Sequence, residues 1–315
     1  MPRAYGFTEY GGPETQELMD VPKPTPGPTE LLVAVKAAGV NPADWKVRAG
    51  LRRDVVALDP PAVLGREVAG VVEEVGRDVD GFVVGDEVFG YTAPGSGGYA
   101  EFTLLTAAQA AKKPTQVSFT DAATLAVSAG TAYDGIRALA LTEGQTLLIN
   151  GIGGGVGVSA AQLARDLGIF VIGTGSEHKR ELAESLGATL VTYGDEGGDE
   201  VSDRVRAIMP GGVDAVFDLV GGNALRAVAG LVKDVSKIIS AADYATAQEL
   251  GGSAVERDRS TQRLAEVAAL VAAGKLDPHV SDVVPLERAG DALHAVESGH
   301  ARGKVVIAVS GVGAG

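Results

Sequence analysis

The stretch Leu147-Leu-Ile-Asn-Gly151-Ile-Gly153-Gly154-Gly155-Val-Gly157 is an apolar run that leads into a glycine-rich turn. Glycines let a chain turn tightly and bring bare main-chain amides and a helix N-terminus against a pyrophosphate, where the helix dipole favours negative charge. The spacing of Gly151, Gly154 and Gly157 is a variant of the common dinucleotide-binding fingerprint. Because glycine runs also form plain tight turns, the surrounding sequence has to decide between the two interpretations.

The chain around this stretch alternates short apolar segments with segments of helical periodicity, a pattern typical of a parallel sheet covered by helices. We expect strands at 146–150, 170–173, 189–192, 215–218 and 237–240. We expect helices between them at 157–167, 178–186, 200–209 and 224–232, and a further helix at about 260–273 that ends at Gly274. The glycine run thus follows the first strand of a doubly wound α/β domain, which favours a dinucleotide site.

Residues 1 to about 120 have many short runs of β-forming residues separated by glycine and proline, which predicts a compact barrel or sandwich. The proline-dense stretch from Val21 to Pro28 predicts an extended connection, because proline lacks an amide donor and fixes φ. A helix capped by Asp121 is expected to extend to about Leu139, with a break at Gly130. A strand at 304–309 is expected to complete one of the two domains.

The charge of the chain excludes several classes of partner. Its 315 residues include 41 acidic and 27 basic side chains, a formal net charge of -14, which repels nucleic-acid phosphates and anionic membrane surfaces. No apolar run approaches the roughly 20 residues that span a bilayer. We therefore expect neither nucleic acid nor membrane as a partner, and a cytoplasmic protein.

Metal-ligating residues are scarce. Cysteine is absent, which excludes disulfides and thiolate metal sites. The 4 histidines have no usual metal-ligand spacing; they are His178, His279, His294 and His300. We expect no metal site.

The second strand of the α/β domain indicates which dinucleotide is bound. An NAD site usually has an acidic residue at the end of this strand, bound to the ribose 2′-hydroxyl. Here the strand leads into Gly173-Thr174-Gly175-Ser176-Glu177-His178-Lys179-Arg180, with hydroxyls at Thr174 and Ser176 and cations at Lys179 and Arg180. These groups suit a 2′-phosphate, so we predict NADPH as the cofactor. The alternative is that both cations are solvated charges on the first turn of a helix.

Several short segments, spread over nearly the whole chain, occur together in one known family. They are Gly39-Val-Asn41-Pro-Ala-Asp44, Gly65-Arg66-Glu67-Val-Ala-Gly70, Val84-Gly-Asp-Glu-Val-Phe-Gly90, Gly97-Gly-Tyr99-Ala-Glu101, Gly130-Thr131-Ala-Tyr133, the glycine run, Val216-Phe-Asp218-Leu-Val-Gly-Gly222 and Gly303-Lys304-Val-Val306. In this order they resemble the medium-chain dehydrogenase/reductase superfamily, and specifically its zinc-independent, zeta-crystallin-like quinone oxidoreductase branch.

The resemblance implies a GroES-like β-barrel substrate domain from residues 1–122 and 275–315, with a Rossmann NADPH-binding domain from residues 123–274 and the active site between them. It implies a homodimer as well. The cofactor contacts that it implies are Asn41 and Thr131 at the nicotinamide and its ribose, Gly154, Gly155 and Val156 at the pyrophosphate, Ser176, Lys179 and Tyr193 at the 2′-phosphate end, and Leu219, Val220, Ser240 and Ala241 at strand ends under the cofactor. A place in the core is an equal alternative for Leu219 and Val220.

Two departures from the family's patterns concern the reaction. Zinc-dependent members hold the metal with a cysteine at the place of Asn41 and a histidine at the place of Arg66, so the resemblance implies a metal-free reductase of electrophilic substrates. Bacterial relatives often have tyrosines where this chain has Lys46 and Arg52. A cation there would stabilise the oxygen that gains charge after hydride addition, so Lys46 and Arg52 join Asn41 as candidate catalytic residues. The alternative is that Lys46 and Arg52 are solvated loop charges.

The sequence therefore predicts an NADPH-dependent oxidoreductase that transfers a hydride to a small quinone or α,β-unsaturated carbonyl compound. Two alternatives stay open: a pathway-specific enoyl reductase, and a crystallin-like or regulatory protein that binds NADPH without turnover. Residues 243–260 are either a flap over the active site or a surface loop.

Overall fold

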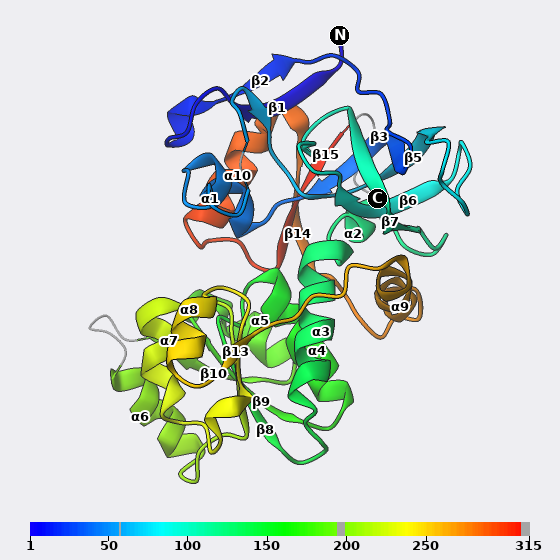
Figure 1. Cartoon of the computed structure of the whole chain (residues 1–315). Helices are drawn as coiled ribbons and strands as arrows, with labels where there is room; N and C mark the ends of the chain where they lie inside the picture. The colour runs from blue at the N-terminus through cyan, green and yellow to red at the C-terminus, as the bar shows by residue number, and fades with distance from the viewer. Residues whose placement is uncertain (57, 194–198, 310–315) are drawn as a thin grey trace. The chain divides into compact units, whose positions relative to one another are not determined.

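The computed structural model describes residues 1–56, 58–193 and 199–309, and the chain divides into two compact units (Figure 1). The first, here called the barrel unit, contains Met1–Val127, Arg259–Gly274 and the chain from Pro278 onward. The second, here called the sheet unit, contains Ser128–Asp258 and Lys275–Asp277. Within the described ranges, every helix is too short or too polar to cross a membrane. The glycine-rich end of the chain lies outside the described residues.

The barrel unit is built mainly from antiparallel strands. Its strands are β1 (Arg3–Phe7), β2 (Gln16–Asp20), β3 (Glu30–Gly39), β4 (Ala62–Val63), β5 (Glu67–Val75), β6 (Glu87–Thr92), β7 (Phe102–Lys112), β14 (Val280–Pro285) and β15 (Lys304–Ala308). β3 pairs with both β5 and β7, and β6 pairs with both of these, so the strands close on themselves and leave no free edge there. β15 pairs with β3, so the C-terminal strand completes this unit. The prediction of a barrel is confirmed, and the proline-dense stretch before β3 is an irregular connection as expected.

The helices of the barrel unit are α1 (Pro42–Arg48), α2 (Phe119–Ala122), α9 (Thr261–Ala272) and α10 (Ala289–Glu297), with 3-10 turns at Pro13–Thr15 and Leu286–Arg288. The predicted domain boundary at residue 274 was wrong for α9, because this helix packs on β7 of the barrel unit. Leu264 and Val267 are buried on its inner face. Helical periodicity predicts that a helix has an apolar face, but it does not say which sheet that face covers. Gly274, with φ 67°, ends the helix as expected.

The sheet unit is a parallel sheet with the strand order β10-β9-β8-β11-β12-β13. Its strands are β8 (Thr146–Asn150), β9 (Phe170–Gly175), β10 (Thr189–Thr192), β11 (Ala215–Asp218), β12 (Ile238–Ser240) and β13 (Ser253–Ala254). Its helices are α3 (Gly130–Leu139), α4 (Gly155–Asp166), α5 (Arg180–Ser185), α6 (Asp199–Ile208), α7 (Gly222–Ala229) and α8 (Tyr244–Glu249), with 3-10 turns at Glu177–Lys179 and Val235–Lys237. Leu147 and Ile149 pack into one core cluster and Leu148 into another, so successive residues of β8 are covered on both faces of the sheet. The doubly wound fold is confirmed.

The predicted helix from residue 122 to about 139 is interrupted, and α3 begins at Gly130, where the break was expected. Ser118, not Asp121, caps α2, since its hydroxyl accepts a hydrogen bond from the Asp121 amide at 3.0 Å. After α2 comes a π-helical turn, Leu125–Ala129, and only then α3. The glycine indicates the break, but the sequence gives no sign that the turn before it is π-helical. The chain passes from the barrel unit to the sheet unit inside the π-helical turn, between Val127 and Ser128.

Candidate functional site

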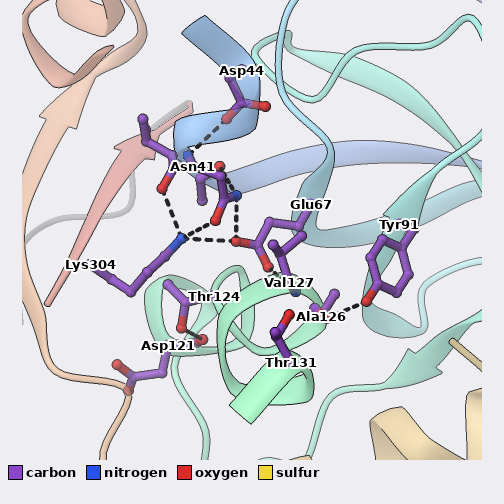
Figure 2. A network of polar contacts seen from close by, with 12 residues as sticks. Asn41, Asp44, Glu67, Tyr91, Asp121, Thr124, Ala126, Val127, Thr131 and Lys304 are labelled. Carbon is purple, nitrogen blue, oxygen red and sulfur yellow. Dashed lines mark hydrogen bonds and ion pairs between the residues drawn. The ribbon is translucent and has the colours of Figure 1, made fainter. Parts of the chain in front are cut away.

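The barrel unit holds a buried polar network around Asn41, at the junction of β3 and α1 (Figure 2). The main-chain amide of Asn41 donates to Asp44 Oδ2 at 2.8 Å. Its side-chain Nδ2 donates to Glu67 Oε1 at 2.8 Å, and its Oδ1 accepts from Lys304 Nζ at 2.8 Å. Both ends of the side-chain amide are therefore engaged within the barrel unit. This geometry gives Asn41 a positioning part, and its predicted contact with a nicotinamide stays a prediction.

An ion pair between Lys304 and Glu67 lies at the centre of this network, with side-chain exposures of 3% and 0%. Lys304 Nζ is 3.0 Å from Glu67 Oε1, and it donates to the Val40 carbonyl at 2.8 Å as well as to Asn41. An ammonium has three donors, so its hydrogen-bonding capacity is used in full. Glu67 Oε2 accepts the main-chain amide of Val127 at 2.7 Å. The pair thus fixes both Asn41 and the last residue of the barrel unit before the crossing.

Asp44 is buried beside this pair. Its Oδ2 accepts from the Asn41 amide and from the Tyr99 hydroxyl, the latter at 2.7 Å, whereas its Oδ1 has no hydrogen-bond partner among the described residues. Burial raises the pKa of Asp44 to about 6, against the opposing effects of the Tyr99 hydrogen bond, the Asn41 amide and the Lys304 charge. Burial, and then the neighbouring Asp44, raise the pKa of Tyr99 well above its ordinary value. The barrel unit therefore contains a buried carboxyl group whose pKa lies above the ordinary range of an aspartate.

The two cations proposed for catalysis have different surroundings. Lys46 lies on α1, half-buried, with Nζ 5.7 Å from the centre of the Trp45 ring. Arg52 follows the helix and is exposed. Its neighbour Arg53 stacks over the Tyr10 ring at 3.8 Å. A role for Lys46 or Arg52 at the substrate stays a prediction.

The glycine run of the sheet unit forms a tight loop between β8 and α4. Gly151 has φ 94°, a conformation that favours glycine. A Cβ on Gly157 would lie 2.5 Å from the Ile152 carbonyl oxygen, so the helix approaches the loop more closely than a side chain allows. A Cβ on Gly154, the N-cap of α4, would have no atom within 4 Å, and Gly155 and Val156 form the open first turn. This loop has the form of an anion cradle and fits the pyrophosphate of a dinucleotide.

Lys179 and Arg180, which looked equivalent in the sequence, differ in the structure. Lys179 is buried, and a Cβ on Gly153 would lie 2.7 Å from its Cδ, so the stem of Lys179 crosses the glycine loop. Arg180 forms a bidentate ion pair with Glu177, in which Nε donates to Oε1 at 2.6 Å and Nη2 donates to Oε2 at 2.8 Å. The Arg180 hydrogen bonds lower the pKa of Glu177. The acidic residue that follows β9 is therefore neutralised by Arg180, and Lys179 is the cation at the loop.

Ser176 and Tyr193, the other residues predicted for the 2′-phosphate end, lie beyond the ends of β9 and β10. Ser176 is half-buried, with its hydroxyl 3.4 Å from His178 Nε2. Tyr193 is exposed, and its main-chain amide donates to the Gly175 carbonyl at 3.4 Å. Their phosphate contacts stay predictions.

A row of polar side chains crosses the sheet where its strands end. Thr174, Asn150, Asp218 and Ser240 are register partners on β9, β8, β11 and β12. Thr174 donates to Asn150 Oδ1 at 2.7 Å and accepts the Gly151 amide at 3.0 Å. The prediction that Thr174 offers its hydroxyl to a phosphate is corrected, because that hydroxyl is buried and both of its roles are used inside the protein. It shapes the glycine loop instead.

Asp218 is the centre of this row and is fully buried. Its Oδ1 accepts from Asn150 Nδ2 at 2.7 Å and from the amides of Val220 and Gly221 at 3.2 and 3.0 Å. Its Oδ2 accepts from the Ser240 hydroxyl at 2.6 Å, so Ser240, predicted to face the cofactor, is also engaged inside the sheet unit. Sequence analysis gave Asn150 and Asp218 no role. The available signal was that several apolar strands each end on a polar residue.

The remaining predicted residues lie around the same strand ends. Leu219 is half-buried against the core of the sheet unit, whereas Val220 and Ala241 are exposed. A Cβ on Gly151 would lie 2.8 Å from Val220 Cγ2, so Val220 borders the glycine loop. Leu219 therefore has the place in the core that was the alternative to a cofactor contact, whereas Val220 does not.

Thr131, on the first turn of α3, accepts a hydrogen bond from Arg257, which sequence analysis missed. Arg257 Nε and the Asp258 amide both bind Asp134 Oδ2 at 3.0 Å. The segment 243–260 therefore contains α8 and β13 and is anchored on α3 near its end.

The comparisons with known proteins agree over most of the chain. Residues 27–115 match the family model described as an alcohol dehydrogenase GroES-like domain, and residues 186–307 match the one described as a zinc-binding dehydrogenase. The chain is 32% identical to 2-methylene-furan-3-one reductase of Solanum lycopersicum, over 97% of this chain and 78% of that protein. It is 29% identical to human quinone oxidoreductase, over 97% of both chains. The structure of Escherichia coli quinone oxidoreductase in complex with NADPH superposes with a TM-score of 0.86, at 26% identity over 97% of this chain and 99% of the other.

Proposed function

We propose, from the premise that this chain belongs to the medium-chain dehydrogenase/reductase superfamily and to its quinone oxidoreductase branch, that it reduces a quinone or an α,β-unsaturated carbonyl compound with NADPH. The chain is an oxidoreductase, and NADPH is its cofactor. The quinone and the conjugated carbonyl share one property: each has an electron-poor carbon or oxygen that accepts a hydride without prior activation by a metal. We further propose a cytoplasmic homodimer.

The observation that carries the proposal is the glycine loop with Lys179 across it. The open first turn of α4 offers amides to a pyrophosphate, and the buried stem of Lys179 directs a cation to the same loop. The strand end that would hold an acidic residue in an NAD site has Ser176 instead, and the next acid, Glu177, is neutralised by Arg180. An anionic 2′-phosphate is favoured by this arrangement, with Ser176, Lys179 and Tyr193 as its proposed ligands.

NADPH, when bound, supplies the hydride, and the protein's task is to hold and orient it. Gly154, Gly155 and Val156 are proposed to bind the pyrophosphate. On the barrel unit, Lys46 or Arg52 is proposed to stabilise the substrate oxygen that becomes negative after hydride addition. Asn41 is held rigidly by Lys304 and Glu67 and is proposed to position the nicotinamide end.

The family description "zinc-binding dehydrogenase" raises a second candidate, metal-dependent alcohol oxidation. Among the described residues, no group of three histidine, aspartate or glutamate side chains is arranged to hold a metal ion. By the family resemblance, Asn41 and Arg66 stand at the places of the zinc ligands of the metal-dependent members, and neither side chain is a usual zinc ligand. We therefore propose the metal-free reduction. Metal analysis of the purified protein checks this choice: one tightly bound zinc per chain would favour the alcohol dehydrogenase reaction.

The test is steady-state oxidation of NADPH by the purified protein with 9,10-phenanthrenequinone and with methyl vinyl ketone, each repeated with NADH. We expect turnover with at least one acceptor, and a kcat/KM for NADPH about tenfold or more above that for NADH, the order of one charge-assisted contact. Binding of NADPH without turnover would favour the non-enzymatic alternative, and equal efficiency with NADH would reject the cofactor assignment. Lys46→Met is expected to lower kcat and leave NADPH affinity unchanged.

A further inference from the structure

Asp218 is a buried carboxylate whose charge is not balanced by a cation. It accepts hydrogen bonds from one side-chain amide, one hydroxyl and two main-chain amides, and all of these donors are neutral. Within the part of the chain that the structure describes, no lysine, arginine or histidine forms an ion pair with it. A buried charge costs free energy unless it is paired, so an unpaired one calls for a functional explanation.

Each hydrogen bond that Asp218 makes is donated by its partner. Three N–H groups point at its Oδ1. Ser240 Oγ already accepts the amides of Ala242 and Asp243, at 3.1 and 2.9 Å, so its own hydrogen is directed to Asp218 Oδ2 at 2.6 Å. Both carboxylate oxygens are therefore acceptors, which is the pattern of the charged form.

The strand order locates this charge relative to a bound dinucleotide. In a doubly wound sheet the dinucleotide crosses the carboxyl edge where the strand order reverses, and its adenosine half lies toward the second strand. Here the reversal falls between β8 and β11, and the second strand is β9. The nicotinamide half consequently belongs to the side of β11 and β12. Asp218 is the last residue of β11, and its partner Ser240 is the last residue of β12.

We propose that the unpaired charge of Asp218 favours the oxidised, cationic nicotinamide over the reduced, neutral one and so promotes hydride release. In the reaction the C4–H bond of NADPH breaks with its electron pair, the acceptor gains that hydride and later a proton from solvent, and the nicotinamide ring becomes positive. A fixed negative charge stabilises this product and the transition state that leads to it. Because Asp218 is fully buried, it acts through space as a positioning and electrostatic residue without touching the ring. The inference rests on the proposed function and adds a determinant of the cofactor's redox balance.

The test measures the Kd of NADP⁺ and of NADPH for the native protein, Asp218→Asn and Asp214→Asn by calorimetry. Asp214 is the matched control, since it lies at the opposite end of β11, where it accepts the Thr146 amide at 2.8 Å and pairs with Lys233. Asp218→Asn is expected to weaken NADP⁺ by about tenfold more than NADPH, the order of one charge–charge interaction near a protein surface. Asp214→Asn is expected to leave the ratio of the two affinities unchanged. An unchanged ratio in Asp218→Asn would overturn the proposal.

A third variant distinguishes the effect of the Asp218 charge from that of disrupting the row of polar side chains. It also tests the proposal if Asp218→Asn does not fold. Ser240→Ala breaks the same row but keeps the carboxylate and removes one of its donors. In Ser240→Ala the Kd of NADP⁺ is expected to fall relative to the Kd of NADPH, because the carboxylate charge is less compensated. This change is opposite to that expected for Asp218→Asn. A ratio that stays constant or shifts toward NADPH would contradict the inference. Failure of the native protein to bind NADPH at all would instead reject the proposed function.

Discussion

The two units of this chain each bury a polar network, and the two networks are balanced differently. In the barrel unit, the carboxylate of Glu67 meets the ammonium of Lys304, and the pair is closed off by Asn41 and main-chain groups. In the sheet unit, the donors to the carboxylate of Asp218 are all neutral among the described residues. The first arrangement is complete in itself, whereas the second keeps an uncompensated charge at a strand end. Substitutions in the barrel-unit network should therefore lower mainly the free energy of unfolding. Substitutions in the sheet-unit network should change mainly the Kd of the cofactor.

The largest expected effect is on stability, from a substitution in the barrel-unit network of Lys304 and Glu67. Lys304→Met leaves the Glu67 carboxylate and the Asn41 oxygen buried without their partner, so the free energy of unfolding should fall by about 3–5 kcal/mol. Urea unfolding followed by the fluorescence of Trp45 measures it. The control is Lys23→Met, which removes an exposed pair with Glu73 and should cost less than about 1 kcal/mol. Equal losses of unfolding free energy in the two variants would show that the buried pair stabilises the fold no more than an exposed surface pair.

The second prediction concerns the pH dependence of the stability of the barrel unit. Burial raises the pKa of Asp44 to about 6, above its ordinary value of 3.8, so the folded protein favours the protonated carboxyl. The contribution of Asp44 to stability is consequently greatest below about pH 4 and declines by about 3 kcal/mol as the pH rises to about 6. Unfolding free energies of the native protein and Asp44→Asn between pH 4 and 7 isolate this term. The native protein should lose stability relative to the variant over that interval, and parallel pH profiles would refute the assignment.

The smallest effect concerns the open loop of the sheet unit. Lys179→Met should raise the Kd of NADPH by about tenfold and leave the unfolding midpoint nearly unchanged, because a charge-assisted contact to phosphate is lost. The matched control is the double variant Arg180→Met/Glu177→Gln, which removes both charges of the neighbouring surface pair, so its effect on Kd should stay below about threefold. If the double variant weakened NADPH as much as Lys179→Met, the distinction between a loop cation and a surface pair would not hold.

The sequence predicted β8 to β12 of the sheet unit, the glycine loop and the barrel, because periodicity and turn chemistry are local properties of the chain, but it did not predict the short strand β13. It did not predict that Lys179 would cross Gly153 while Arg180 would pair with Glu177, since both cations occupy one short polar segment. It also missed the π-helical turn after α2, where an alanine-rich sequence fits several helical forms. The assignment of α9 failed for a related reason: the apolar face was visible in the sequence, but its partner strand β7 was not.

By itself, then, the amino-acid sequence determined the fold class, the glycine loop after the first strand and the family of this oxidoreductase. Only the tertiary structure decided which side chains are held inside and which remain for a ligand. Asp218 and Asn150 are 68 residues apart, and Lys304 and Glu67 are 237 apart. Contacts across such separations leave no local pattern, because they depend on which strands become neighbours after folding. The balance of charge inside each network follows from those neighbours.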